Sequence, residues 1–321
     1  MKVYIKTPAR LHLGLIDLNG NLGRIFGGLG VGINHPNVIL EAETSEKLSI
    51  TGEENMLVTS LAKRFFETYH TKTNVNINVK ESIPTHIGLG SGTQLALAVA
   101  SALAKLFNVQ TSTQELALAM GRAKRTGVGT AIFEKGGFVV DGGKIAKNGI
   151  CVPGKFSPLI FRQPFPENWR FVVAIPNVKK GLANEAEKSA FNQLPPIPPE
   201  EVGKVCRLTM LKLLPSLVER DIENFGDALT SIQNVTGEYF AHVQGGKYSS
   251  QASTECISFM QKLGVHGVGQ SSWGPALYGL VMKEDAKKTR LQVQAHLKKN
   301  VGGQVFVAKA DNKGASIKLT K

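Results

Sequence analysis

A glycine-rich segment over residues 83–97 constrains the fold of this chain most. Alternating apolar residues over 75–79 precede it and predict a β-strand, and an Ala/Leu-rich stretch over 93–107 follows it and predicts a helix. Glycines let the backbone take positive φ angles and approach a ligand closely, and a helix start presents free N–H groups and a positive dipole end. The segment therefore predicts a strand–loop–helix unit that binds an anion, most naturally a phosphate.

Two familiar phosphate-binding classes do not fit this loop, and a tight turn before a capped helix remains the alternative. No Gly-Lys-Ser/Thr ends the loop, which excludes a Walker P-loop. The glycines at 88, 90 and 92 alternate without the later third glycine of a dinucleotide-binding fingerprint.

Length, composition and cysteine usage indicate a globular protein of two ordinary domains. The chain has 321 residues, of which 42% are hydrophobic, so a sizeable core is available. Its three cysteines are far apart, which favours a reducing cytoplasm over a disulfide framework or a zinc site. The first 18 residues alternate apolar with polar and predict a strand rather than a signal peptide, and no run reaches membrane-span length.

The net charge of +13 suggests an anionic partner. Lys and Arg are scattered, without a basic block or an aromatic-studded basic stripe, so we expect no nucleic-acid binding. Small phosphate-rich substrates fit this charge better, and a basic solvated surface is the plainer explanation.

The apolar periodicity predicts an α+β fold, because strands and helices mix without a regular βαβ repeat. A proline-rich stretch over 153–168 predicts a boundary between domains 1–160 and 161–321. The glycine-dense run over 24–33 would be a poor buried strand, so we expect its backbone to pass close to another group, with a ligand as one candidate. Helices are predicted over 55–69, 93–107, 113–122, 200–219, 222–243, 254–263 and 286–300, and strands over 3–15, 38–42, 48–51, 169–176, 276–281 and 304–308.

Several motifs resemble those of the GHMP kinase superfamily of small-molecule kinases. Pro84-x-x-x-Gly88-Leu89-Gly90-Ser91 is similar to its phosphate-binding loop. The form Gly-Leu-Gly-Ser-Gly-Thr-Gln over 88–94 resembles one branch, the beta-ribofuranosylaminobenzene 5'-phosphate synthases of methanopterin biosynthesis, which share the fold without being kinases. Segments 9–18, 23–28, 125–143 and 267–275 also resemble this branch, so the resemblance covers most of the chain.

The resemblance implies a two-domain GHMP kinase-like fold and a reaction between small molecules. Phosphoribosyl pyrophosphate condenses with 4-aminobenzoate or 4-hydroxybenzoate, a C–C bond forms, and CO2 and pyrophosphate leave with the help of Mg²⁺. The phosphate- and substrate-binding residues that we expect are Gly88, Gly90, Ser91, Gly92, Thr93, Gln94, Arg125, Gln270 and Ser271.

Three further residues are candidates for the chemistry. The Asp17 carboxylate would stabilise positive charge on the sugar, and Arg24 would bind a phosphate or the benzoate carboxylate as a rigid fork. Asp141 is the candidate Mg²⁺ ligand. The structural alternatives are a turn residue for Asp17, a surface ion pair for Arg24 and a hairpin turn for Asp141.

Some side chains near the motifs are expected to be structural. His12 and His86 are interpreted as packed or hydrogen-bonded residues rather than bases, and Trp273 as a core residue rather than a platform for an aromatic substrate. Lys124 and Arg125 beside the glycines of 127–129 favour a phosphate, with solvated charge as the alternative.

Two other functions remain open on the same fold. One is an ATP-dependent small-molecule kinase, and the other is a non-catalytic module that binds a metabolite or nucleotide. Many GHMP kinases carry a catalytic aspartate in the segment that matches 126–130 and a second serine at the position of Gly92, and both are absent here, which favours the synthase. We expect small-molecule partners, no membrane contact, and a homodimer as the candidate assembly.

Overall fold

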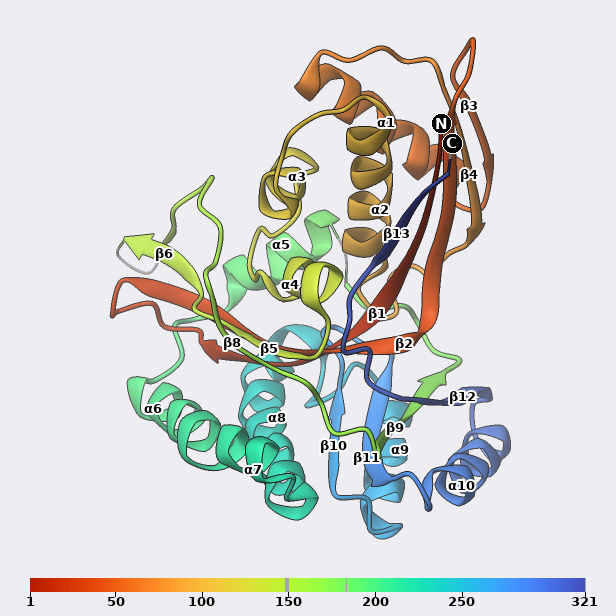
Figure 1. Ribbon diagram of the computed structural model, residues 1–321. Coiled ribbons are helices and arrows are strands. Elements are labelled where there is room, and N and C mark those ends of the chain that lie inside the picture. The colour runs from red at the N-terminus through yellow and green to blue at the C-terminus, as the bar shows by residue number, and fades with distance from the viewer. Residues whose placement is uncertain (148–149, 183, 321) are drawn as a thin grey trace.

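Two β-sheets carry the fold (Figure 1). In the computed structural model, which describes residues 1–147, 150–182 and 184–320, a nine-stranded sheet contains the order β13-β1-β2-β4-β3, with β5 and β6 also paired to β2. A four-stranded sheet has the order β10-β11-β9-β12. The strands are β1 (Lys2–Asp17), β2 (Arg24–Thr44), β3 (Ser49–Gly52), β4 (Val75–Glu81), β5 (Phe138–Asp141), β6 (Lys144–Lys147), β7 (Ile150–Cys151), β8 (Leu159–Gln163), β9 (Trp169–Pro176), β10 (Gly267–Gln270), β11 (Leu277–Met282), β12 (Gly303–Ala308) and β13 (Ser316–Thr320).

Helices cover both sheets. Figure 1 shows α1 to α4 gathered on one side of the long β1–β2 hairpin, with α6 to α10 around the second sheet. Helix α2 packs on β1 and β2, whereas α8 packs on β10 and also reaches β1. The helices are α1 (Asn55–Tyr69), α2 (Ser91–Leu106), α3 (Thr113–Ala119), α4 (Val128–Lys135), α5 (Asn184–Gln193), α6 (Pro199–Leu208), α7 (Leu214–Glu219), α8 (Ile222–Gln244), α9 (Gln251–Lys262) and α10 (Ala286–Lys299), with a π-helical turn η1 (Thr209–Leu213) before α7.

Period-two burial makes β1 and β2 the frame of the first sheet. Leu11, Leu13 and Leu15 of β1 are buried, whereas Arg10 and His12, which alternate with them, are only half-buried and lie on the other face. Strand β2 pairs with β1 along most of its length, then with β4 near its end and with β5 and β6 near its start. The hairpin therefore extends into the region where the two sheets meet.

The fold class and most predicted elements are confirmed. Helix α1 has the predicted bounds, and Ser112 caps α3 with a capping box, although α3 ends three residues before the predicted end. The predicted 200–219 helix is interrupted by η1, just before Pro215 of α7. Helix α5 and strand β13 were not predicted, because α5 is polar on average and β13 is exposed.

The two sheets divide the chain between β8 and β9, that is, between Gln163 and Trp169. The C-terminal strand β13 returns to the first sheet and pairs with β1, and Figure 1 places the two termini side by side. Within the described residues, no helix is long and apolar enough to cross a membrane.

The prediction for the glycine-dense run 24–33 is confirmed for the close approach of its backbone to another group, but the run is a buried strand after all. These residues form the first half of β2, and Gly28 and Gly30 lie against Val128 of helix α4. A Cβ on Gly28 would lie 2.5 Å from Val128 Cγ2, and one on Gly32 would lie 2.9 Å from the Asp311 carbonyl oxygen. The missing side chains let α4 pack against the strand backbone, which compensates for the poor strand propensity of glycine.

We expect Gly30→Ala to destabilise the protein. The new methyl group would overlap Val128 Cγ1 and lie 3.0 Å from the Leu11 carbonyl oxygen, so strand and helix must separate. Overpacking of this kind costs about 1–3 kcal/mol of unfolding free energy. Thermal and urea unfolding measure the loss.

Gly203→Ala is the matched control, because Gly203 lies in α6 with no atom within 4 Å of the added Cβ. It should leave stability unchanged or raise it by up to about 1 kcal/mol, as Ala replaces Gly in a helix. Equal effects of the two substitutions would contradict the packing argument.

Candidate active site

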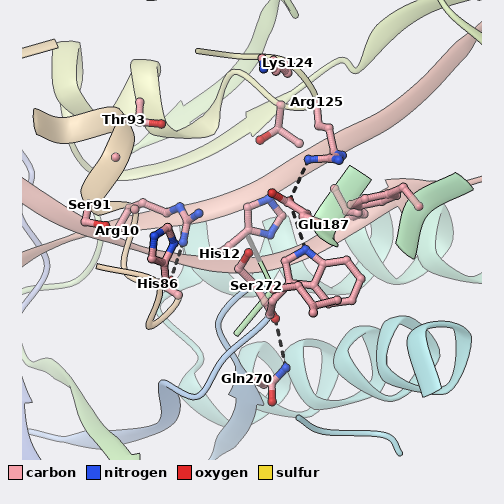
Figure 2. Close-up of a pocket in the computed structure, with 18 of the residues that line it drawn as sticks. Arg10, His12, His86, Ser91, Thr93, Lys124, Arg125, Glu187, Gln270 and Ser272 are labelled. Atoms are coloured by element: carbon pink, nitrogen blue, oxygen red, sulfur yellow. Dashed lines mark hydrogen bonds and ion pairs between the residues drawn. The ribbon is translucent and has the colours of Figure 1, made fainter. Parts of the chain in front are cut away.

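A cavity of about 560 Å³ lies between the two halves of the molecule. Its walls come from β1, the start of α1, the loop before α2, the α3–α4 loop, α5, α8 and the turn after β10. Figure 2 shows side chains from these segments turned toward a common space. The cavity therefore joins segments that are far apart in sequence.

The start of α2 forms one end of the cavity. Gly90 is the N-cap residue with φ 79°, and the N–H groups of Thr93 and Gln94 both donate to its carbonyl oxygen at 3.1 Å. The earlier N–H groups of the helix have no intrahelical acceptor and remain available to an anion. Five of the predicted residues line this end: Gly88, Gly90, Ser91, Gly92 and Thr93.

Two arginines flank the helix start. Arg10 Nη1 donates to the Gly88 carbonyl oxygen at 2.6 Å, and Arg122 Nε donates to Thr93 Oγ1 at 3.4 Å. Added Cβ atoms would lie 2.8 Å from Arg10 Cγ at Gly90 and 3.1 Å from Arg122 Nη2 at Gly92. The glycines thus let both guanidinium groups approach the helix N-terminus, where they add positive charge to its dipole.

Arg10 keeps its charge at neutral pH. Burial is the main cause that lowers its pKa to about 10, and the Arg122 charge adds to the effect, while Glu187 opposes it. A charged, partly desolvated arginine pair beside free N–H groups binds phosphate or pyrophosphate strongly.

Two of the predicted substrate-binding residues lie behind the cavity wall instead. Buried Ser271 donates from Oγ to the Gly88 carbonyl oxygen at 2.6 Å. The same Oγ accepts a hydrogen bond from the backbone N–H of His12 at 2.9 Å. Buried Gln94 donates to the Gly129 carbonyl oxygen at 2.9 Å and so joins α2 to α4. Neither side chain lines the cavity, so their roles are to position the loop and the helices.

Gln270 and Arg125, which are expected to bind substrate, do line the cavity. Gln270 Nε2 donates to the Ser272 carbonyl oxygen at 3.1 Å, and its Oε1 accepts the Ser249 N–H at 2.8 Å. These bonds fix the turn after β10, which carries Trp273.

An aromatic wall forms the other end of the cavity: Phe191 of α5, Phe240 of α8, and Trp273. Their ring centroids are 5.5 Å apart for Phe191–Phe240 and Phe191–Trp273 and 4.8 Å apart for Phe240–Trp273, all with edge-to-face geometry. Trp273 is buried, as predicted for a core residue, and it also lines the cavity. Such a wall suits a flat aromatic ring.

Glu187 connects the aromatic wall to the cationic loop. Its Oε1 accepts from Arg125 Nη1 at 2.8 Å and from Trp273 Nε1 at 3.1 Å (Figure 2). Arg125 Cζ also lies 4.0 Å from the centroid of the Phe191 ring, a cation–π contact.

The cavity is strongly cationic. Six lysine and arginine side chains line it, against two glutamates: Arg10, Arg122, Lys124, Arg125, Lys188 and Lys247, with Glu185 and Glu187. This excess concentrates the positive charge of the chain around the space and suits a ligand with more than one phosphate group.

The structure does not bring Asp17 and Arg24 into this cavity, which corrects the expectation of a shared cleft. Asp17 Oδ1 accepts the N–H groups of Asn19 and Gly20 at 2.7 and 2.8 Å, so the residue forms the turn. Arg24 is exposed, and its Nη1 donates to the carbonyl oxygens of Gly142 and Gly143. Hairpin register is the cause, since Asp17 pairs with Phe26 while Arg24 pairs with Ile145 of another strand.

Asp141 is also corrected from a metal ligand to a structural residue. Its buried carboxylate accepts the N–H groups of Gly127 and Gly143, both at 2.9 Å, and thereby holds the start of α4. Burial raises the pKa of the Asp141 carboxyl to about 6, although these hydrogen bonds act to lower it. Within the described parts of the chain, no group of three His, Cys, Asp or Glu residues is arranged to hold a metal ion.

The sequence reasoning missed Arg10, Arg122, Glu187, Phe191 and Phe240. Only Arg10 carried a usable signal, because it alternates with buried leucines in β1 and shares its face with His12. The other four come from a loop and two helices, and only the folded chain brings them together.

His12 should stay uncharged well below neutral pH. Burial, with a smaller contribution from the Arg10 charge, lowers its pKa to about 3. In the unfolded chain the imidazole gains a proton near pH 6.5, so acidification from pH 6.5 toward 3 favours unfolding. This loss reaches at most about 1.4 kcal/mol per pH unit.

The His12→Gln variant lacks the titrating group and should lose less stability over the same range. Urea unfolding of both proteins at several pH values measures this difference. Parallel curves between pH 6.5 and 3 would show that His12 is not desolvated.

Comparisons with known proteins agree with this fold. The GHMP kinases N-terminal domain model matches residues 56–137, and the GHMP kinases C-terminal model matches 213–299. A galactokinase from Lactococcus lactis, solved with galactose, has the same fold, with a TM-score of 0.71 and 14% identity over 98% of this chain and 95% of that chain.

Two curated relatives are similar along nearly the whole chain. Beta-ribofuranosylphenol 5'-phosphate synthase of Methanothermobacter thermautotrophicus is 31% identical over 332 aligned positions, covering 98% of both chains. The protein of the same name from Archaeoglobus fulgidus is 33% identical over 322 positions, covering 98% of this chain and 99% of its own. By this identity, and by the two GHMP kinase domains, the chain belongs to the beta-ribofuranosylphenol 5'-phosphate synthase family of the GHMP kinase superfamily.

Proposed function

We propose that the protein is a beta-ribofuranosylphenol 5'-phosphate synthase of methanopterin biosynthesis. It transfers the phosphoribosyl group of phosphoribosyl pyrophosphate to the ring carbon of a para-substituted benzoate and releases CO2 and pyrophosphate. The observation that carries the proposal is one cavity with a cationic helix N-terminus at one end and an aromatic wall at the other. The two ends match the two substrates.

The bond changes balance without an external oxidant or base. The C1–O bond of the ribose breaks, and its electron pair leaves with pyrophosphate. The ring carbon that bears the carboxylate donates a pair to C1, and loss of CO2 returns a pair to the ring. The relatives' product name contains a phenol, which favours 4-hydroxybenzoate over 4-aminobenzoate as the acceptor.

The cationic end would bind the pyrophosphate. Free N–H groups of α2 and the guanidinium groups of Arg10 and Arg122 stabilise the charge that grows on the leaving group. Lys124, Lys188 and Lys247 would neutralise the 5'-phosphate of phosphoribosyl pyrophosphate. The aromatic wall would hold the benzoate ring and exclude water from the reacting carbons.

Mg²⁺ belongs to the proposal as an ion bound largely by the substrate. Mg²⁺ typically takes few protein ligands and several phosphate and water oxygens. The hydroxyl groups of Ser91 and Thr93, which line the phosphate end, fit such an oxygen-only site. When bound, the ion neutralises charge on the pyrophosphate.

The test is an assay with phosphoribosyl pyrophosphate, Mg²⁺ and carboxyl-labelled 4-hydroxybenzoate, in which released CO2 is counted. We expect CO2 release that requires both substrates, and a parallel reaction with 4-aminobenzoate ranks the acceptors. ATP replaces the donor in a second arm, with a panel of small hydroxyl acceptors. Because no carboxylate occupies 126–130, no acceptor-dependent ADP should form. ADP formation without any CO2 release would replace the synthase with a kinase.

Substitutions at the two ends should separate the two substrates. Arg122→Met removes a charged partner of the donor and should raise its KM on the order of 10–100-fold. Phe240→Leu removes one ring of the aromatic wall and should raise the KM for the benzoate roughly 2–10-fold, because an aromatic contact is worth less.

Lys299→Met, an exposed charge at the end of α10, serves as the control and should change neither KM. Steady-state kinetics with each substrate varied in turn gives all these values. A donor effect from Phe240→Leu equal to that from Arg122→Met would contradict the assignment of the two ends.

A further inference from the structure

The proposed reaction needs stabilisation at a point between the two ends of the cavity. The ribose C1 is bonded to pyrophosphate before transfer and to the benzoate ring afterwards, so it must lie where the phosphate end meets the aromatic wall. Positive charge develops on C1 and on the ring oxygen as pyrophosphate departs. A carboxylate at this junction would stabilise that charge, and Asp17, the candidate from sequence, lies elsewhere.

Glu187 occupies the junction. Its charge opposes the lowering of the pKa of Arg10, Arg122 and Arg125, so the carboxylate acts on all three guanidinium groups around the phosphate end. The same carboxylate accepts a hydrogen bond from Trp273 Nε1 of the aromatic wall at 3.1 Å. No other acidic side chain described in the structure has contacts of both kinds.

The Glu187 side chain is held in place and still accessible from the cavity. Arg125 and Trp273 both donate to Oε1, and no residue in the described part of the chain donates to Oε2. The side chain is 27% exposed, whereas Glu185 on the same helix is 89% exposed and pairs with Lys188. Two fixed donors on one oxygen orient the other without further cost at the moment of reaction.

We propose that Glu187 is a catalytic residue whose carboxylate stabilises the oxocarbenium character of the ribose during transfer. This inference rests on the proposed function. Glu187 forms no bond and moves no proton, so the electron balance of the reaction is unchanged. The carboxylate pairs with Arg125 and would lie opposite the departing pyrophosphate.

A purely structural role would be to hold Arg125, and kinetics separate the two roles. The Glu187 carboxylate repels the phosphate groups of phosphoribosyl pyrophosphate. Glu187→Gln removes this repulsion, so it should leave the KM for phosphoribosyl pyrophosphate unchanged or lower it. Loss of transition-state stabilisation should lower kcat on the order of 10²–10³-fold. If Glu187 only positioned Arg125, its loss would raise the donor KM instead.

A cationic sugar analogue provides a second readout. An iminoribitol 5-phosphate carries a protonated ring nitrogen where the oxocarbenium charge develops. In the presence of Mg²⁺ and pyrophosphate, it should bind Glu187→Gln roughly tenfold or more weakly than wild type. Calorimetry measures this affinity without turnover.

Glu284→Gln is the control, since it removes the same charge from an exposed glutamate that does not line the cavity, and it should behave as wild type. Glu187→Asp keeps the charge on a shorter side chain and should recover part of both kcat and analogue affinity. This variant also keeps the test valid if Glu187→Gln does not fold, which thermal melts reveal.

The outcomes separate the two proposals. A kcat of Glu187→Gln near that of wild type, or a raised donor KM with unchanged analogue affinity, would overturn the role of Glu187 alone. A wild-type protein that releases no CO2 would instead count against the proposed function.

Discussion

The carbonyl oxygen of Gly88 is the point on which the candidate site depends. It accepts hydrogen bonds from Arg10 Nη1 and Ser271 Oγ, both at 2.6 Å, and Ser271 in turn accepts the His12 N–H. Strand β1, the phosphate loop and the turn after β10 thereby meet at one atom. The carbonyl is partly buried, and each hydrogen bond of this kind contributes on the order of 1 kcal/mol, so the three segments stabilise one another. Glycine at 88, with φ 88°, is needed because a side chain would overlap the Ser271 carbonyl group.

Local patterns in the sequence were sufficient to predict most of the fold. The period of apolar residues defined α1 and β9 at their observed bounds, and the strand–loop–helix unit from β4 to α2 has the expected order. The patterns failed where tertiary contacts override propensity. The glycines of β2 form a strand because α4 packs on them, and β13 forms because β1 offers it an edge. Neither partner is visible from the local sequence.

The candidate site was predictable only along one segment. The phosphate loop is contiguous, so its residues could be named before the fold was known. The aromatic wall and Glu187 come from α5, α8 and the turn after β10, and the Trp273–Glu187 hydrogen bond spans 86 positions in the sequence. The expectation for Asp17 and Arg24 failed for a related reason. Closeness in a hairpin does not fix which cavity a side chain reaches, because strand register decides that.

The packing of residues 126–130 explains why a carboxylate for the chemistry would come from α5. Many GHMP kinases carry their catalytic aspartate in the segment matching 126–130. Here a Cβ on Gly129 would lie 3.0 Å from Thr93 Cγ2, and one on Gly127 would lie 3.1 Å from Phe156 Cε1. The segment is pressed against α2 and its N–H at Gly127 is bound by the buried Asp141 carboxylate.

A second carboxylate in that segment would need space that the packing does not provide. It would also approach Asp141, whose pKa is already raised to about 6 by burial. Two like charges in one buried site disfavour the ionisation of both groups. Across the cavity, Glu187 instead has one ion pair, with Arg125, and one hydrogen bond, from Trp273 Nε1. An anion at that wall faces the sugar from the aromatic side, where a departing pyrophosphate leaves positive charge on C1. The placement suits transfer of a sugar to an aromatic ring and does not place a base beside a hydroxyl at the phosphate loop.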